Sequence, residues 1–131
     1  MKYLLDTDIC IYVINERPRR VLDRFSRHSV GDLGVSGITV AELAFGVEKS
    51  GSARNRAALD AFLLPLEIAA YDLAAALCYG GIRSALERKG TPVGPLDTLI
   101  AAHALSLGVT LVTNNQREFK RIHGLRVENW A

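Results

Sequence analysis

Short apolar segments that alternate with longer, helix-like segments are the feature of this 131-residue chain that most restricts its fold. The clearest is Val109–Thr113, and similar segments lie at Tyr3–Leu5 and Leu33–Val35, with less apolar candidates at 66–68 and 126–128. Apolar runs of this length, bounded by polar residues or glycine, are typical of buried strands. Strands that alternate with helices predict an α/β fold whose central sheet is mostly parallel and covered by helices on both faces.

Helix signals fill the segments between these strands. Apolar residues recur at helical spacing from Ile9 to Ile14, and a helix is predicted over residues 18–28 after Pro18. Thr39 followed by Glu42 matches a capping box at a helix start. Further helices are predicted over 52–64, 71–89 and 96–107, and a short basic helix after residue 113.

Length and composition exclude several other classes of protein. With 49% hydrophobic and 23% charged residues, the chain fits one globular domain that spans residues 1–131. No apolar run approaches the roughly 18 residues of a membrane span, and the N-terminus lacks the apolar region of a signal peptide. Cys10 and Cys78 lie among apolar or small residues, and we interpret them as reduced core thiols. Together these points predict a cytoplasmic protein without membrane association.

The net charge of +2 is small, but the basic residues gather in two stretches. The first contains Arg17, Arg19, Arg20, Arg24 and Arg27, and the second contains Arg117, Lys120 and Arg121. Solvated helix faces would account for both stretches. From charge alone this is the favoured interpretation, and contact with the phosphates of a nucleic acid is the alternative.

Four acidic residues stand at predicted junctions between elements: Asp6, Asp8, Glu42 and Asp97. Each has a structural explanation as a helix cap or as a partner of a helix dipole. Several junctions of a parallel α/β sheet share one edge, however, and carboxylates gathered there raise one another's pKa. A magnesium ion would relieve that repulsion and could activate water against a phosphodiester. The acids are therefore either separate caps or one metal site.

The histidines and aromatic residues favour packing over chemistry. His28, His103 and His123 have no metal-ligand spacing, and His103 is predicted to be a core histidine on an apolar helix. We predict that Phe45 and Tyr79 pack in the core, whereas Tyr12, one turn after Asp8, is suited either to core packing or to stacking on a base.

Four segments of the chain resemble PIN-domain nucleases, and in particular the VapC toxins of bacterial toxin–antitoxin pairs. They are Leu4–Asp8, Ser36–Leu43 with Gly46, Gly90–Asp97 with Ile100–Ala104, and Val112–Phe119 with Gly124 and Val127–Trp130. An Asp-x-Asp pair alone would be a weak signal, whereas four segments in the family's order are specific. The resemblance implies a three-layer α/β/α PIN-like fold and an endoribonuclease that depends on Mg²⁺ or Mn²⁺.

Carried over by position, Asp6, Glu42 and Asp97 match the family's acidic metal ligands. Thr113 and Asn115 fall where many PIN domains place a fourth acid, and the resemblance implies that they join the catalytic set by positioning water or a phosphate oxygen. The auxiliary candidates are Asp8, Thr7 and Glu118, and the candidates for RNA phosphates are Arg17, Arg19, Arg20, Arg117 and Lys120.

The resemblance also implies partners: an RNA substrate, with the anticodon loop of a transfer RNA as the expected target, a VapB-type antitoxin, and a second copy of the chain in a homodimer. Two alternatives stay open at this point. One is a non-enzymatic module that binds nucleic acid or protein and uses its acids as helix caps. The other is a HAD-like phosphatase, because Asp6-Thr7-Asp8 after a strand resembles its nucleophile motif, although the later acidic pair of that class is missing.

Overall fold

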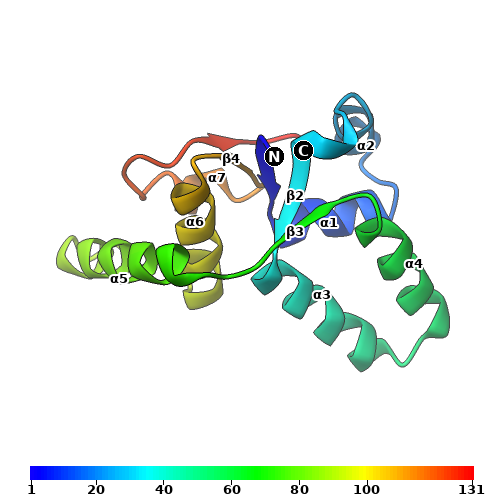
Figure 1. Ribbon diagram of the computed structural model, residues 1–131, viewed down its shortest axis with the longest axis horizontal. Coiled ribbons are helices and arrows are strands. Elements are labelled where there is room, and N and C mark those ends of the chain that lie inside the picture. The colour runs from blue at the N-terminus through cyan, green and yellow to red at the C-terminus, as the bar shows by residue number, and fades with distance from the viewer.

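A computed structural model describes all 131 residues, and Figure 1 shows its arrangement. The elements, in chain order, are β1 (Tyr3–Leu5), α1 (Thr7–Ile14), α2 (Arg19–Ser26), a 3₁₀ turn (Val30–Asp32), β2 (Leu33–Ser36), α3 (Gly37–Ser50), α4 (Ala53–Leu63), β3 (Glu67–Ala69), α5 (Leu73–Arg88), α6 (Pro95–Leu107), β4 (Thr110–Val112), α7 (Gln116–Phe119) and β5 (Val127–Glu128). Strands and helices alternate as the sequence predicts.

The five strands form one sheet in the order β3-β2-β1-β4-β5, and every neighbouring pair is parallel. The first strand is therefore the central one, and its Leu4 lies opposite Gly34 of β2 and Leu111 of β4. Because the strands are parallel, the segments that leave their carboxyl ends start from one edge of the sheet. The polar residues after β1 and β4 meet there.

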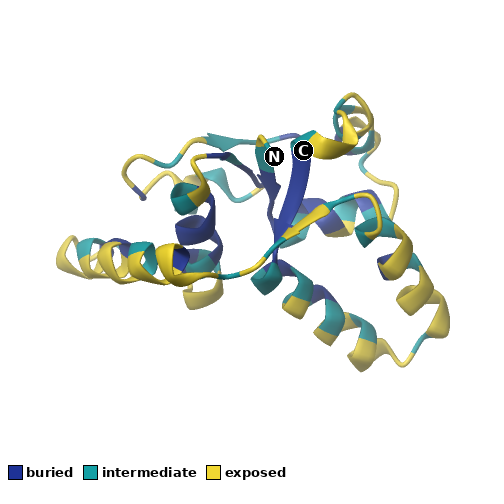
Figure 2. Ribbon diagram, in the orientation of Figure 1, coloured by how far each residue is buried: buried dark blue, intermediate teal, exposed yellow.

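Helices cover the sheet on both sides, so the predicted three-layer α/β/α arrangement is confirmed (Figure 1). Successive strand residues point to opposite faces. Leu4 and Leu111 accordingly pack into a core with α5, α6 and α7, whereas Leu5 and Val112 pack into a second core with α1 to α4. Figure 2 shows the central strands buried and the outer surfaces of the helices exposed.

Two predictions about individual residues are wrong. α3 begins at Gly37, and its N-cap is Ser36, whose Oγ accepts a hydrogen bond from the Ile38 N–H at 3.1 Å. Thr39 and Glu42 therefore lie inside the helix and do not form a capping box. Phe45, expected in the core, is 68% exposed because it lies on the outer side of α3.

Other packing predictions are confirmed. His103 is buried, with Nδ1 2.8 Å from the Ser36 Oγ, and burial lowers its pKa. Cys10 and Cys78 are free thiols. Tyr12 and Tyr79 are half-buried at the edges of the two cores. No helix has the length and hydropathy to cross a membrane.

The C-terminal residues return to the body of the protein. The buried Trp130 ring stacks on His28 with ring centroids 4.9 Å apart, and its Nε1 donates to Glu128, which also accepts from Arg24. The Asn129 side-chain amide donates to the Asn114 side chain at 3.2 Å. The last residues are thus attached to the loop that follows β4.

Candidate active site

Asp6 lies where the central strand ends, and it is 4% exposed. It is the N-cap of α1: its Oδ1 accepts from the Thr7 N–H at 2.8 Å, and its Oδ2 accepts from the Thr113 hydroxyl at 2.7 Å. Burial is the main cause of its raised pKa, and the nearby Glu42 carboxylate raises it further. The structure thus holds a carboxylate at the carboxyl edge of the sheet with both of its oxygens oriented.

Asp8 lies two residues further on, in the first turn of α1. Its oxygens accept from the Ile9 N–H at 2.7 Å and the Asn114 N–H at 3.1 Å. Burial and the negative charge of Asp6 raise the pKa of Asp8 to about 6. The contact with Asn114 joins the start of α1 to the loop after β4.

Glu42 reaches the same place from α3, one turn and a half after the N-cap Ser36. The Thr7 hydroxyl donates to its Oε1 at 2.6 Å and lies 3.5 Å from the Thr39 hydroxyl. Thr7 therefore connects the carboxylate of α3 to the N-terminus of α1. The predicted capping box thus drew attention to a residue of the candidate site, but Glu42 does not cap its own helix. Its side chain contacts Thr7 of α1 instead.

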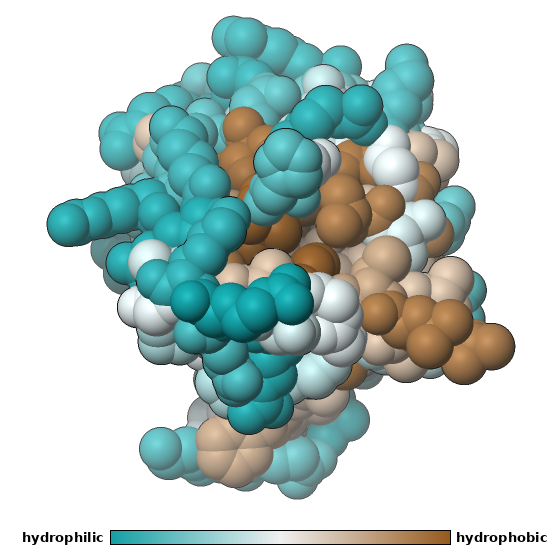
Figure 3. All heavy atoms as spheres, turned by 90° about the vertical axis from the view of Figure 1, so that its left-hand side faces the viewer, coloured by the Kyte–Doolittle hydropathy of each residue, from teal (hydrophilic) through white to brown (hydrophobic).

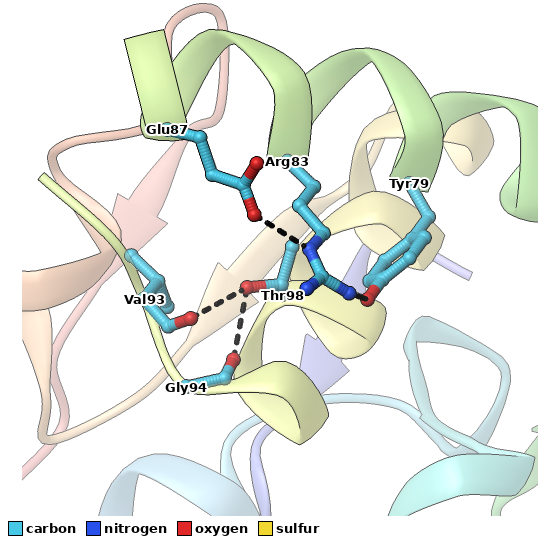
Figure 4. A network of polar contacts seen from close by, with 6 residues as sticks. All are labelled: Tyr79, Arg83, Glu87, Val93, Gly94 and Thr98. Carbon is cyan, nitrogen blue, oxygen red and sulfur yellow. Dashed lines mark hydrogen bonds and ion pairs between the residues drawn. The ribbon is translucent and has the colours of Figure 1, made fainter. Parts of the chain in front are cut away.

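Asp97 lies in the first turn of α6, which starts at Pro95 after Gly94. No side chain caps this helix. Instead the Thr98 hydroxyl donates back to the carbonyl oxygens of Val93, at 3.2 Å, and Gly94, at 2.9 Å (Figure 4). The same view shows Arg83 of α5 between Tyr79 and Glu87, beside this turn. The backbone at the start of α6 is therefore fixed, although the Asp97 carboxylate itself accepts no hydrogen bond.

These acids line one open hollow. Its walls are formed by Asp6, Thr7, Asp8, Ile11, Glu42, Asp97 and Asn115. Burial raises the pKa of Asp97 to about 6, and the negative charges of Asp6, Glu118 and Glu42 contribute to this shift. The negative charges of these acids therefore affect one another. Asp6 follows β1, Glu42 lies on α3 and Asp97 lies on α6, so three separate elements contribute to the site. Ile11, one turn after Thr7, is the only apolar residue of the wall.

Thr113 and Asn115, predicted from their position after the last long strand, are both at the site. The Thr113 hydroxyl accepts from the Asn115 N–H at 3.0 Å while it donates to Asp6. The Asn115 side-chain amide donates to Glu118 at 2.6 Å, and the Asn115 side chain lines the hollow. Sequence reasoning missed Asn114, whose backbone N–H holds Asp8, because a backbone contact leaves no signal in residue type.

The predicted basic residues divide into two groups. Arg117 and Lys120 are exposed on or next to α7, which begins immediately after Asn115. The residues before and at the start of α2 do not line the hollow: Arg17, Arg19 and Arg20. The Arg19 Nε lies 4.0 Å from the Asp23 Oδ1. By position, Arg117 and Lys120 are therefore better placed than Arg17, Arg19 and Arg20 to contact a ligand in the hollow.

The donor chemistry of the hollow fits a hard divalent cation. Carboxylate oxygens surround it, and the pKa shifts show desolvated acids without a neighbouring positive charge. No three acidic or histidine side chains stand at the spacing of a closed metal shell. Magnesium does not need such a shell, because it keeps several waters and binds through one or two carboxylates together with substrate phosphates.

The fold and this acidic edge define the class of the protein: the chain belongs to the PIN-domain family. The family's model, "PIN domain", matches residues 3–125.

Within that family the chain belongs with the VapC ribonucleases. It is 47% identical over 132 residues to the "tRNA(fMet)-specific endonuclease VapC" of Salmonella typhimurium, covering 100% of this chain and 99% of that protein. It also resembles the crystal structure of DNA-bound VapBC from Salmonella typhimurium, with a TM-score of 0.92, 46% identity and coverage of 100% and 99%. VapBC2 from Rickettsia felis, bound to a promoter DNA fragment, gives a TM-score of 0.91 and 41% identity, with both chains covered in full.

Proposed function

We propose that this protein is a metal-dependent endoribonuclease, and that it acts as the toxin of a toxin–antitoxin pair. The observation that carries the proposal is the convergence of Asp6, Glu42 and Asp97, from three separate elements, on one open hollow. Relatives of the same length and fold are named ribonucleases, which supports hydrolysis of RNA. Separate helix caps would not require three acids to lie within one another's electrostatic influence.

The side chains have distinct roles in this proposal. Asp6, Glu42 and Asp97 would hold Mg²⁺ or Mn²⁺, with Asp8 as an auxiliary acid. The bound ion supplies charge stabilisation for the scissile phosphate and lowers the pKa of water. Thr113 fixes Asp6, and Thr7 fixes Glu42, so that both carboxylates keep their orientation while substrate enters.

Two further groups would act on the substrate itself. Asn115 offers an amide oxygen to water or to a phosphate oxygen, because its NH₂ group is held by Glu118. Arg117 and Lys120 would contact the phosphates next to the cleaved bond, without reading base sequence. Arg17, Arg19 and Arg20 would serve phosphates further along the chain of a large RNA.

We infer a transfer RNA as the substrate, in the cytoplasm, with cleavage in the anticodon loop. The support is the Salmonella relative, which is named for tRNA(fMet). Bases in a single-stranded loop are accessible to an open site, whereas those in an A-form helix are not. The same relatives support a VapB-type antitoxin as partner, since the similar solved structures are VapBC complexes.

A homodimer is also part of the proposal. Leu73 and Leu77 of α5 are 73% and 69% exposed, one turn apart on the side of the helix that faces away from α6. A second copy would remove this apolar surface from water. Light scattering of the purified protein should give twice the mass of the chain, and Leu77→Glu should give the single mass.

The test of the activity uses antitoxin-free protein and total bacterial RNA. Discrete cleavage of a small RNA is expected with Mg²⁺, and none with EDTA or with Asp97→Asn, provided that circular dichroism shows this variant folded. A folded wild-type protein that leaves all RNA intact and binds no Mn²⁺ in calorimetry would establish the binding-module alternative. Turnover of a phosphate monoester would instead support the phosphatase alternative.

A further inference from the structure

A second hollow lies between α5, α6 and the residues that follow α7, and no part of the proposed mechanism uses it. Its volume is about 270 Å³, and its floor is apolar: Ile82 and Leu86 of α5, Leu105 of α6, and Ile122. We call this hollow the α5–α6 notch. Figure 3, which faces this side of the molecule, shows apolar surface exposed between hydrophilic side chains.

The rim of the α5–α6 notch is positively charged. Lys89, Arg121 and His123 line it, and no acidic residue does. None of the three takes part in an ion pair within the protein. Arg121 is held in place because its guanidinium donates to the Pro92 carbonyl at 3.0 Å, and this single contact leaves its other N–H groups available.

The notch is connected by α7 to the open hollow that Asp6, Glu42 and Asp97 line, which we call the catalytic hollow. This helix starts next to Asn115, which lines the catalytic hollow, and the chain then reaches Arg121, which lines the notch. Arg117 and Lys120 are exposed between the two. Three exposed cations, Arg117, Lys120 and Arg121, therefore follow one another in the chain between the two hollows, and a strand of nucleic acid that spans both needs cations along its path.

From this combination we propose that the α5–α6 notch is a second subsite for the RNA, which takes one unstacked nucleobase on its apolar floor while Lys89, Arg121 and His123 bind the adjacent phosphates. The inference rests on the proposed function and extends it to a surface outside the catalytic hollow. An apolar floor beside cations suits a base and its phosphate, because the base has an apolar face and the backbone is an anion. An acidic protein segment would match the rim equally well, but it would not explain the cations that continue along α7.

Gly81 offers a way to fill the notch without disturbing the core. It lines the notch on the exposed side of α5, and a Cβ at this position would meet no heavy atom within 4 Å. Gly81→Leu should therefore occupy the notch. Gly80→Leu is the matched control, because Gly80 is also exposed on α5, has equally open space, and does not line the notch. Light scattering should confirm that both variants keep the oligomeric mass of the parent.

The readout is RNA affinity in an Asp97→Asn background, so that the probe is not cleaved. The probe is a fluorescein-labelled single-stranded RNA of about 20 nucleotides, taken from the cleaved region found with total RNA, and binding is followed by anisotropy. Loss of one docked base should weaken binding about tenfold in Gly81→Leu, because the base would no longer bury its apolar face against the aliphatic floor. Gly80→Leu should bind like the parent.

Two further measurements identify the ligand groups. An abasic site moved along the probe should weaken binding at one position in the parent, and at none in Gly81→Leu. Lys89→Gln should reduce the slope of log affinity against log salt by about 0.7, as expected for one lost phosphate contact on a single strand. Arg88→Gln, at a neighbouring exposed position outside the notch, is the control for net charge.

The outcomes separate this inference from the function on which it rests. If the wild-type protein cleaves no RNA, the proposed function falls, and this inference falls with it. If the parent binds and the wild-type enzyme cleaves RNA, while Gly81→Leu matches Gly80→Leu, only the notch assignment is overturned. It is overturned as well if Gly81→Leu keeps its RNA affinity but loses affinity for the purified antitoxin, which would make the notch a protein-docking site.

Discussion

The two sides of the proposed catalytic hollow are held in different ways. On the strand side, Asp6 and Asp8 each accept two hydrogen bonds, and the donors include the Thr113 hydroxyl and the Asn114 N–H. On the helix side, the Asp97 carboxylate accepts none, although the turn that carries it is fixed by Thr98. The first side is already oriented by the fold, whereas Asp97 keeps its coordinating capacity for a ligand.

This difference teaches how one site can be both stable and reactive. Hydrogen bonds to a buried carboxylate offset its desolvation, so the strand side can be part of the core. An acid without donors leaves its negative charge uncompensated until a cation or a proton arrives. We therefore expect substitutions on the strand side to lower stability, and substitutions on the helix side to lower activity.

The largest effect should come from the helix side. Asp97→Asn should lower kcat for RNA cleavage by about a thousandfold, because the ion loses a charged ligand. Its free energy of unfolding at pH 7 should not fall, since no hydrogen bond is lost and one like charge is removed. Single-turnover cleavage and urea denaturation on the same preparation check both parts. A clear loss of stability would break the comparison.

The next effect concerns the strand side. Thr113→Val keeps the side-chain shape but removes the donor to the Asp6 Oδ2, which is buried. Leaving a buried acceptor without its partner should lower the free energy of unfolding by about 1–3 kcal/mol. Thr110→Val is the control, because Thr110 lies in β4, three residues before Thr113, and its hydroxyl makes no hydrogen bond within the protein. Equal urea midpoints for the two variants would contradict the expected role of Thr113.

A pH titration of metal-free protein should show the desolvation and mutual repulsion of the acids, which hydrogen bonds offset only in part at Asp8. The pKa values of Asp8 and Asp97, each about 6, exceed the unfolded value of 3.8, so the folded state binds more protons between pH 4 and pH 6. The free energy of unfolding should therefore fall as the pH rises through this window, and stay low above it. After solvent screening, the loss should be on the order of 1 kcal/mol.

The control for this titration is Asp8→Asn/Asp97→Asn, which should show a smaller change between pH 4 and pH 6. Millimolar Mn²⁺ should reduce the loss in the wild-type protein at pH 7, since a bound cation favours the ionised acids. The assignment of raised pKa values would be contradicted if the free energy of unfolding of the wild-type protein increased between pH 4 and pH 6, and did so by more than that of the double variant.

The smallest effect should come from Glu118, which acts through Asn115. Glu118→Gln can keep one contact to the Asn115 amide but removes a negative charge close to Asp97. We expect kcat to fall only a few-fold, with KM unchanged, because orientation is weakened and no ligand is lost. Asn115→Ala should lower kcat more than Glu118→Gln does. A larger decrease in Glu118→Gln would show that Glu118 acts directly on the substrate.

Much of the site could be predicted because it depends on features that residue type and order record. The alternation of strands and helices predicts the parallel sheet, and the sheet places Asp6 and Thr113 at one edge. The start of the helix that carries Glu42 was recognised from a capping box at Thr39 and Glu42, whereas the N-cap of that helix is Ser36. Family resemblance brought in Asp97, which propensity alone explains as an ordinary acid in a first helical turn.

The parts that could not be predicted depend on three-dimensional contact. The Thr7–Glu42 hydrogen bond joins two helices whose packing angle no local pattern specifies. Phe45 sits among apolar residues in the sequence, yet it is exposed, because the helical face it occupies has no neighbour within the chain. The α5–α6 notch combines three separate segments, so neither its floor nor its rim is visible as a motif.

The central position of β1 also determines when, during synthesis, the toxin can become active in the cell that produces it. β1 is synthesised first, but one of its two neighbours, β4, pairs Leu111 with Leu4 more than a hundred residues later. A nascent chain on the ribosome thus has no partner on one side of β1, and no Thr113 to orient Asp6, until translation is nearly complete. Long-range pairing of this kind forms slowly, so the active site is assembled only at the end of synthesis, and antitoxin that is already present in the cell can bind the toxin as the site forms.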